Sequence, residues 1–187
     1  MPGNLILCPT FDHSDSLFMS IASVRAQTVE AWRMVVICDG VPPRTIEVLE
    51  AICGDDPRIT YVSHSKGERY GEAYRDAVIR EASEDFIFHL SDDDIWSAVH
   101  LERMRALLEE ADWGYQSELG VQLAGGSAWT PHNLGTEAMR RAWGRHRFTT
   151  GGLNNVAYRR RAYLSLKEGW VPAPAHLPSD CFMWAKF

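Results

Sequence analysis

Three consecutive carboxylates, Asp92, Asp93 and Asp94, follow directly on the apolar run 86–90. Adjacent carboxylates at the end of a buried strand repel one another and lose hydration, and both effects disfavour their charged forms. A hard divalent cation offsets this cost, because Mg²⁺, Mn²⁺ and Ca²⁺ prefer carboxylate oxygens. A solvated acidic turn that caps the next helix is the alternative. The elements around the triplet must decide between the two.

The triplet belongs to a regular alternation of apolar strands and amphipathic helices. Apolar runs at 4–8, 32–38, 59–63 and 86–90 predict buried strands, and apolar residues at helical spacing predict helices between them. An alternation with a period of ~25 residues is typical of a parallel sheet with crossover helices. We therefore expect an α/β fold with a mostly parallel twisted sheet and helices on both faces.

Polar side chains follow each of the four predicted strands. In parallel sheets, ligands bind beyond the carboxyl ends of the strands, so these side chains should converge on one edge. Neither GxGxxG after the first strand nor GxxxxGK[ST] is present, which disfavours dinucleotide-binding and P-loop chemistry. The residues expected at the shared edge are Thr10, Asp12, Asp39, His64 and the aspartate triplet.

Length and composition fit one ordinary globular domain. The chain has 187 residues, of which 45% are hydrophobic and 24% charged, and it can bury a real core. No apolar run reaches the ~18 residues of a membrane span, and the N-terminus lacks the basic region of a secretory signal. We therefore expect no transmembrane segment and a cytoplasmic location. The four cysteines form no CxxC pair, so neither a zinc site nor a disulfide framework is expected.

The net charge of −6 hides a basic segment in the second half of the chain. Between residues 131 and 170, eight Lys and Arg residues stand against two Glu residues. Such a segment facing the triplet would suit a metal-bound phosphate ligand or an acidic acceptor. Solvated helix faces are the interpretation we favour for most of these arginines.

Several short segments along residues 1–110 resemble, in order, motifs of a known family. Residues 7–11 resemble the opening strand of family 2 inverting glycosyltransferases, which ends in Pro-Thr and an aromatic residue. Residues 20–28 resemble the helix end with the pattern S-x-x-x-Q-T, and residues 35–40 resemble the second strand with its aspartate. The remaining two are residues 69–77, similar to G-x-x-x-A-R-N-x-G with Asp76 for asparagine, and residues 90–94, similar to the DXD-type motif.

The second half resembles the same family in outline. Residues 178–184 resemble its E-D-x-x-x-W stretch, whose aspartate is the general base, with Ser179 in the place of the glutamate. The resemblance implies a GT-A-like (Rossmann-like) fold as a single domain over residues 1–187. Residues 1–110 would form the nucleotide-sugar-binding half, and residues 111–187 would form the acceptor and catalytic half.

The resemblance also implies a role for each candidate site residue. A divalent cation, Mn²⁺ or Mg²⁺, would stabilise the leaving diphosphate as a Lewis acid, and inversion requires a base that takes the proton of the acceptor hydroxyl. The implied nucleotide-sugar-binding residues are Thr10, Phe11, Asp39, Arg69 and Asp92; the implied metal ligands are Asp93 and Asp94; the implied catalytic base is Asp180.

Several of these residues have a structural alternative. Phe11 would stack on the base or pack in the core, and Asp39 would bind the uracil or ribose or brace a turn. Arg69 would pair with the base edge or diphosphate or lie at the surface. Asp94 and Asp180 would also serve as helix N-caps. Open candidates are His132, His146 and His176 for a third metal ligand, and Trp129, Trp143 and Trp170 for a sugar platform or simply the core.

These patterns predict a metal-dependent inverting glycosyltransferase that moves a sugar from a nucleoside-diphosphate sugar, expected to be a UDP-sugar, to a hydroxyl acceptor. A nucleotidyltransferase shares a similar sheet and acidic metal site, but it usually carries a Gly-rich basic loop after the first strand, which residues 9–14 lack. A non-catalytic nucleotide-sugar-binding module is the other alternative. The acceptor stays open among saccharides, lipid-linked carriers, proteins and nucleic acids.

Overall fold

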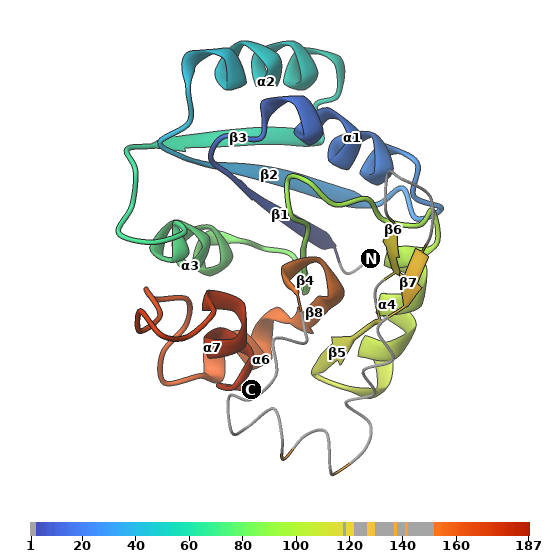
Figure 1. Cartoon of the computed structure of the whole chain (residues 1–187). Helices are drawn as coiled ribbons and strands as arrows, with labels where there is room; N and C mark the ends of the chain where they lie inside the picture. The colour runs from blue at the N-terminus through green and yellow to red at the C-terminus, as the bar shows by residue number, and fades with distance from the viewer. Residues whose placement is uncertain (1–2, 118, 122–126, 130–136, 138–140, 142–151) are drawn as a thin grey trace.

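The main feature of the fold is a six-stranded sheet with helices on both faces (Figure 1). The computed structural model describes residues 3–117, 119–121, 127–129, 137, 141 and 152–187. The strands lie in the order β3-β2-β1-β4-β8-β5. Their bounds are β1 Asn4–Thr10, β2 Trp32–Asp39, β3 Ile59–His64, β4 Phe86–His89, β5 Trp113–Tyr115 and β8 Val156–Arg159.

The helices alternate with the first four strands, as the sequence predicts. Pro43 opens its helix at the position where proline is tolerated. No helix of the described residues is long and apolar enough to cross a membrane. The helices are α1 Ser14–Arg25, α2 Pro43–Asp55, α3 Glu72–Glu81, α4 His100–Glu110, α6 Arg160–Ser165 and α7 Ser179–Trp184, with a short 3₁₀ turn η1 at Leu153–Asn155.

The four predicted strands pair in parallel, and the second half adds an antiparallel part. β1 lies between β2 and β4, and β2 pairs with β3, all in parallel. β8 runs antiparallel to both β4 and β5, so the chain after residue 110 joins the same sheet. The expected mostly parallel sheet is confirmed. The assignment of nucleotide-sugar binding to residues 1–110 and of acceptor binding and catalysis to residues 111–187 stays a prediction.

The apolar residues of 115–123 predict one further strand, and this prediction is wrong in its extent. β5 ends at Tyr115 in the main sheet, whereas β6 (Leu119–Val121) pairs with β7 (Ser127–Trp129) in a separate two-stranded sheet. Residues 116–118 separate β5 from β6 and contain neither glycine nor proline. The apolar pattern therefore carries no signal for the break.

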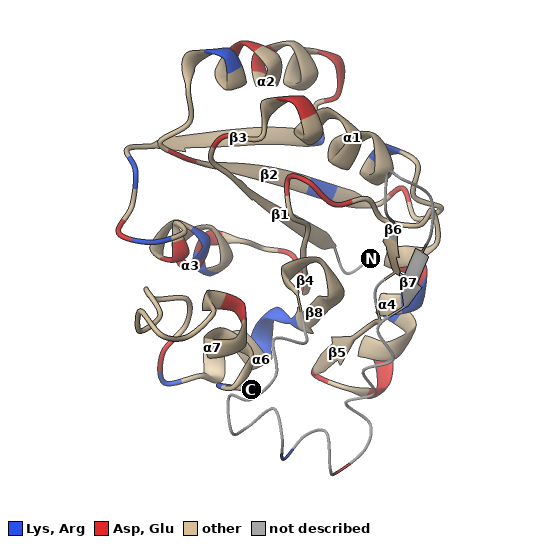
Figure 2. Ribbon diagram, viewed as in Figure 1, with Lys and Arg blue, Asp and Glu red and all other residues tan. Residues whose placement is uncertain are grey.

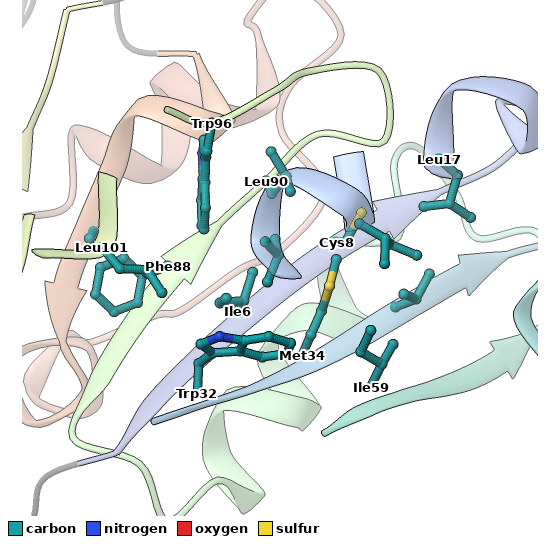
Figure 3. Packing of buried hydrophobic residues seen from close by; sticks show 14 of the residues in the cluster. Ile6, Cys8, Leu17, Trp32, Met34, Ile59, Phe88, Leu90, Trp96 and Leu101 are labelled. Carbon is teal, nitrogen blue, oxygen red and sulfur yellow. The ribbon is translucent and has the colours of Figure 1, made fainter. Parts of the chain in front are cut away.

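Strand side chains alternate between two hydrophobic cores. Ile6 and Met34 face the side covered by α1, α2 and α4, where Figure 3 shows them packed with Phe88. Leu5 and Val35 face the opposite side, covered by α3, α6 and α7. Each fully buried Leu, Ile or Phe stabilises the fold by about 1.5–3 kcal/mol relative to exposure. Burial on both faces explains why β1, β2 and β4 read as continuous apolar runs.

Candidate active site

The carboxyl ends of β1, β2 and β4 open into a cleft of about 620 Å³. Asp12 after β1, Asp39 at the end of β2 and Asp92 after β4 all line it. The predicted convergence is confirmed for these strand ends, and Figure 2 shows their acidic segments at the same end of the sheet. His64, after β3, is not among the described residues that line the cleft and stacks instead on Tyr74 at 3.9 Å.

The loop that carries the aspartate triplet is held by the end of α1 and the residues after it. The Gln27 side chain donates to Ser97 O at 2.8 Å and accepts from Leu101 N–H at 2.9 Å. The Trp96 N–H donates to Ser23 Oγ at 3.2 Å. These bonds satisfy backbone groups that would otherwise be buried without a partner. Residues 23–28 therefore fix the segment that follows the aspartates.

Asp92 and Asp93 come together with a histidine from the loop after β1. His13 Nδ1 lies 3.0 Å from Asp92 Oδ1, and one ligand atom from each of His13, Asp92 and Asp93 falls within 4.8 Å of the others. The hydrogen bond to Asp92 raises the pKa of the exposed His13 imidazole. Two carboxylates and an imidazole are a donor set that suits Mn²⁺. These residues fit a divalent cation.

His13 was not among the ligands expected from the sequence. It lies in the loop that follows the first predicted strand, next to Asp12, and this position was the one available signal. Asp94 lies outside both this cluster and the described cleft lining, and its N–H contacts Ser91 O at 3.4 Å. His176 is exposed, while His132 and His146 lie outside the described residues. A ligand role for Asp94 stays a prediction.

Asp39 is braced by two donors from the segment after β3. Lys66 Nζ lies 2.6 Å from Oδ2, and the Gly67 N–H donates to Oδ1 at 2.5 Å. Asp39 is 3% exposed and lines the cleft together with Lys66. A carboxylate oxygen accepts more than one hydrogen bond, so Asp39 braces this turn and keeps capacity for a ligand. Lys66 is a second site residue that the sequence reasoning missed.

A glycine with left-handed backbone lets α3 approach Asp39. Gly71 has φ of +69°, and a Cβ there would lie 3.2 Å from the Asp39 Cβ and Cγ atoms. We expect Gly71→Ala to cost about 1–2 kcal/mol of stability through its backbone alone. It should also weaken nucleotide binding by displacing Asp39.

Chemical denaturation and calorimetric titration with UDP measure the two effects of Gly71→Ala. Gly54→Ala is the matched control, because Gly54 lies in the last turn of α2 and a Cβ added there would meet no atom within 4 Å. It should leave UDP affinity unchanged and increase stability by about 0.4–1 kcal/mol. Equal UDP affinity in Gly71→Ala and wild type would contradict the tight packing of Gly71 against Asp39.

Three further residues expected to contact the nucleotide sugar line the same cleft. Phe11 is 49% exposed, so the core-packing alternative for this ring is wrong. Thr10 is buried, and its Oγ1 has no hydrogen-bond partner among the described residues. Arg69 is half-buried and donates from Nη1 to Ala173 O at 3.0 Å. All three are placed to meet a ligand, whereas Trp170 is 1% exposed and belongs to the core.

Asp180 reaches the cleft from α7, in the second half of the chain. It is half-buried, and its Oδ1 accepts the Cys181 N–H at 2.8 Å. The N-cap of α7 is Pro178, so the N-cap alternative for Asp180 is wrong. Burial raises the pKa of the Asp180 carboxyl, and the Arg75 guanidinium opposes this rise. A carboxylate with a raised pKa is a stronger base, which suits proton abstraction.

Arg75 is a buried cation that the sequence reasoning did not assign to the site. It is 3% exposed, lines the cleft, and lies over the Trp170 ring at 4.0 Å from guanidinium carbon to ring centroid. Burial lowers its pKa to about 10, and the negative charges of Glu72 and Asp180 oppose this. Arg75 therefore stays protonated at neutral pH and supplies a positive charge beside Asp180.

The Lys and Arg residues of the segment 131–170 that the structure describes do not line the cleft, although Leu153 of the same segment does. Arg161 pairs with Asp112 at 2.8 Å, and Arg160 donates to backbone oxygens of α3. Arg141 pairs with Glu137, and Arg140, Arg145 and Arg147 lie outside the described residues. The interpretation as exposed helix faces therefore holds for Arg141 and Arg161, whereas Arg159 lies in β8 and Arg160 is half-buried.

The family follows from a comparison with protein-family models. The model described as "Glycosyl transferase family 2" matches residues 5–164, which include the strand ends, the aspartate triplet and β8. The chain belongs to glycosyl transferase family 2. A comparison with curated proteins found no match.

Three solved structures share the fold of this chain. S. aureus TarS 1-349 superposes with a TM-score of 0.70 at 13% identity, over 97% of this chain and 53% of that one. The complex of TarS 1-349 with UDP-GlcNAc has a TM-score of 0.69 at 14% identity, over 98% of this chain and 53% of that one. The complex of a Pyrobaculum calidifontis mannosyltransferase, PcManGT, with GDP-Man and Mn²⁺ has a TM-score of 0.64 at 13% identity, over 96% of this chain and 49% of that one. This family 2 chain thus has the GT-A fold and spans about half the length of these proteins.

Proposed function

We propose that this family 2 chain is a metal-dependent inverting glycosyltransferase that uses a nucleoside-diphosphate sugar, with UDP as the preferred nucleotide. One observation carries the proposal. A single cleft brings the nucleotide-side residues Asp39 and Asp92 together with Asp180 of α7. Transfer with inversion requires a donor site and a base in one cavity, because the acceptor hydroxyl loses its proton while it attacks the anomeric carbon.

The base and ribose would lie against the ends of β1 and β2. Phe11 presents an exposed ring on which a base can stack. The Asp39 carboxylate offers a hydrogen-bond acceptor and the Lys66 ammonium a donor, with Oδ2 and Nζ 2.6 Å apart. Uracil carries a ring N–H beside a carbonyl and is complementary to this pair, whereas cytosine has a bare ring nitrogen there and carries its donor on the exocyclic amine. Arg69 would meet the diphosphate or the base edge, and Asp92 the ribose. Thr10 would donate its free hydroxyl.

The cation would be held chiefly by Asp93, with His13 and Asp92 beside it. A divalent cation neutralises charge that develops on the leaving diphosphate. An imidazole among oxygen ligands favours Mn²⁺ over Mg²⁺, which prefers oxygen ligands alone. The complex of PcManGT with GDP-Man and Mn²⁺ supports this choice of metal.

Asp180 would act as the general base. Asp180 lines the same cleft as the strand ends, but it belongs to α7, in the second half of the chain. Arg75 keeps the ionised form accessible despite burial. The Cys181 N–H bond orients one carboxylate oxygen, which leaves the other for the acceptor hydroxyl.

The first experiment measures nucleotide binding and donor cleavage. We expect UDP with Mn²⁺ to raise the melting temperature, UDP to bind more tightly than CDP or ADP, and UDP-sugars to be hydrolysed slowly in the absence of an acceptor. Micromolar UDP affinity at 1 mM ligand would stabilise the protein by about 4 kcal/mol, a shift of roughly 8–16 °C for a domain of this size. No response to any nucleoside diphosphate with metal would reject the proposal.

The same measurements separate the alternatives. Release of pyrophosphate from a nucleoside triphosphate would indicate a nucleotidyltransferase, which family membership disfavours. Tight UDP binding with no turnover of any donor would indicate a non-catalytic binding module. The acceptor and the expected cytoplasmic location stay predictions, and a screen of saccharide, lipid-linked, protein and nucleic-acid acceptors addresses the first.

A further inference from the structure

Glu72, the first residue of α3, is a buried acid to which the scheme above gives no role. Its side chain is 1% exposed. Oε2 accepts the Tyr70 N–H at 2.9 Å, and Oε1 accepts the Ser179 hydroxyl at 2.5 Å. A carboxylate is costly to bury unless its oxygens are hydrogen-bonded. The two bonds therefore hold Glu72 in one orientation.

The bond to Ser179 joins α3 to the first turn of α7, across 107 residues of the chain. Ser179 begins α7, and Asp180 follows it directly. α7 has six residues, too few for a helix to be stable without tertiary contacts. Its position, and with it the direction of the Asp180 carboxylate, must be set by neighbouring elements.

Arg75 and two tryptophans complete the contact between α3 and α7. The Arg75 guanidinium lies over Trp170, and the Trp170 ring packs edge-on against Trp184 of α7 at 5.2 Å. These apolar contacts hold the far side of α7. The Glu72–Ser179 bond is the polar contact at the end of α7 that faces the cleft, since both Ser179 and Asp180 line it.

We propose that Glu72 is a positioning residue for Asp180 and acts through the Ser179 hydroxyl. The inference rests on the proposed function, because it takes Asp180 as the base. By tying the first turn of α7 to α3, the bond keeps the carboxylate directed into the cleft. A misplacement of about 1 Å in such a group lowers the rate about 10²-fold. A single hydrogen bond can thus affect turnover far more than stability.

Ser179→Ala tests the link, because it removes the hydroxyl and leaves Glu72, Arg75 and Asp180 in place. Mn²⁺-dependent hydrolysis of a UDP-sugar is the assay, with water in the place of the acceptor. We expect kcat to fall about 10–100-fold. The KM for the donor and the Kd for UDP should change less than about twofold, the pattern of an interaction made in the transition state.

Two further variants control this experiment. Ser179→Thr retains a hydroxyl and should recover most of kcat. Ser165→Ala is the matched control, because the Ser165 hydroxyl donates to Ala162 O within α6, and it should behave as wild type. An unchanged kcat in Ser179→Ala overturns the inference. So does a parallel loss of kcat, UDP affinity and melting temperature, which indicates general structural support.

A second readout needs no turnover. In metal-free protein labelled with carbon-13 at the aspartate carboxyls, the signal missing from Asp180→Asn reports on Asp180. We expect Ser179→Ala and Glu72→Ala to shift the pKa read from this signal, and Ser165→Ala to leave it unchanged. If the pKa read from the Asp180 signal is the same in both variants as in wild type, the inference is overturned. If the wild-type protein neither binds nucleotide nor cleaves donors, the proposed function is rejected. The nuclear magnetic resonance measurement still tests separately whether Glu72 positions Asp180.

Discussion

We expect Asp180→Asn protein to bind UDP and Mn²⁺ as tightly as wild type but to lose about 10²–10⁴-fold in sugar transfer, the usual contribution of a general base. Asparagine has the same shape and retains an oxygen for the Cys181 N–H, which donates to Asp180 Oδ1 at 2.8 Å. It cannot take a proton from an acceptor hydroxyl. Donor hydrolysis and UDP titration on the same sample measure the two properties.

The raised pKa of Asp180 fixes the direction of two further effects. A base works only when ionised, so wild-type turnover should fall on acidification at a pH above the ordinary aspartate range of about 3.9. A carboxyl whose pKa is raised by folding stabilises the fold when protonated, and this contribution is lost as the pH rises through the folded-state pKa. At neutral pH, Asp180→Asn should therefore be at least as stable as wild type.

Asp112→Asn is the matched control for Asp180→Asn. Asp112 is exposed and pairs with Arg161 at 2.8 Å, at the β5 side of the sheet. Exposed ion pairs contribute about 0–1 kcal/mol, so this variant should keep both stability and turnover. Full turnover in Asp180→Asn would remove this residue from the mechanism, whatever the behaviour of the control.

We expect Asp93→Asn to abolish tight Mn²⁺ binding, and with it the Mn²⁺-dependent part of the UDP affinity. Asp93 is the exposed carboxylate of the cluster with His13 and Asp92, so it is the member most accessible to a cation. Changes in residues that merely orient a metal ligand cost about 10–100-fold in metal affinity, and loss of a ligand should cost at least as much. Electron paramagnetic resonance of free Mn²⁺ during titration measures the affinity without turnover.

Two other variants sharpen the metal experiment. His13→Gln should weaken Mn²⁺ more than Mg²⁺, because it removes the only nitrogen donor of the cluster. Asp94→Asn tests the ligand role predicted for Asp94, which lies outside the cluster: a change in Mn²⁺ affinity of less than about threefold would remove Asp94 from the metal site. Loss of Mn²⁺ binding in Asp94→Asn and not in Asp93→Asn would exchange the roles given to these two residues.

Much of the fold and part of the site could be predicted from the sequence. Apolar runs separated by amphipathic segments predicted the four parallel strands, because a strand buried on both faces must be apolar throughout. The convergence of Asp39 and Asp92 on one cleft followed from strand direction alone, since the carboxyl ends of parallel strands meet at one edge. For such residues, local pattern and sheet topology suffice.

Tertiary structure alone decided the remaining contacts of the site. His13 lies 3.0 Å from Asp92, Lys66 lies 2.6 Å from Asp39, and Ser179 joins α7 to α3. β8 likewise enters the sheet in antiparallel orientation between β4 and β5. No periodicity or motif records these pairings, because each depends on where loops and short elements from distant parts of the chain pack. The sequence by itself determined which chemistry the strand ends could perform, whereas packing of the second half decided which side chains surround it.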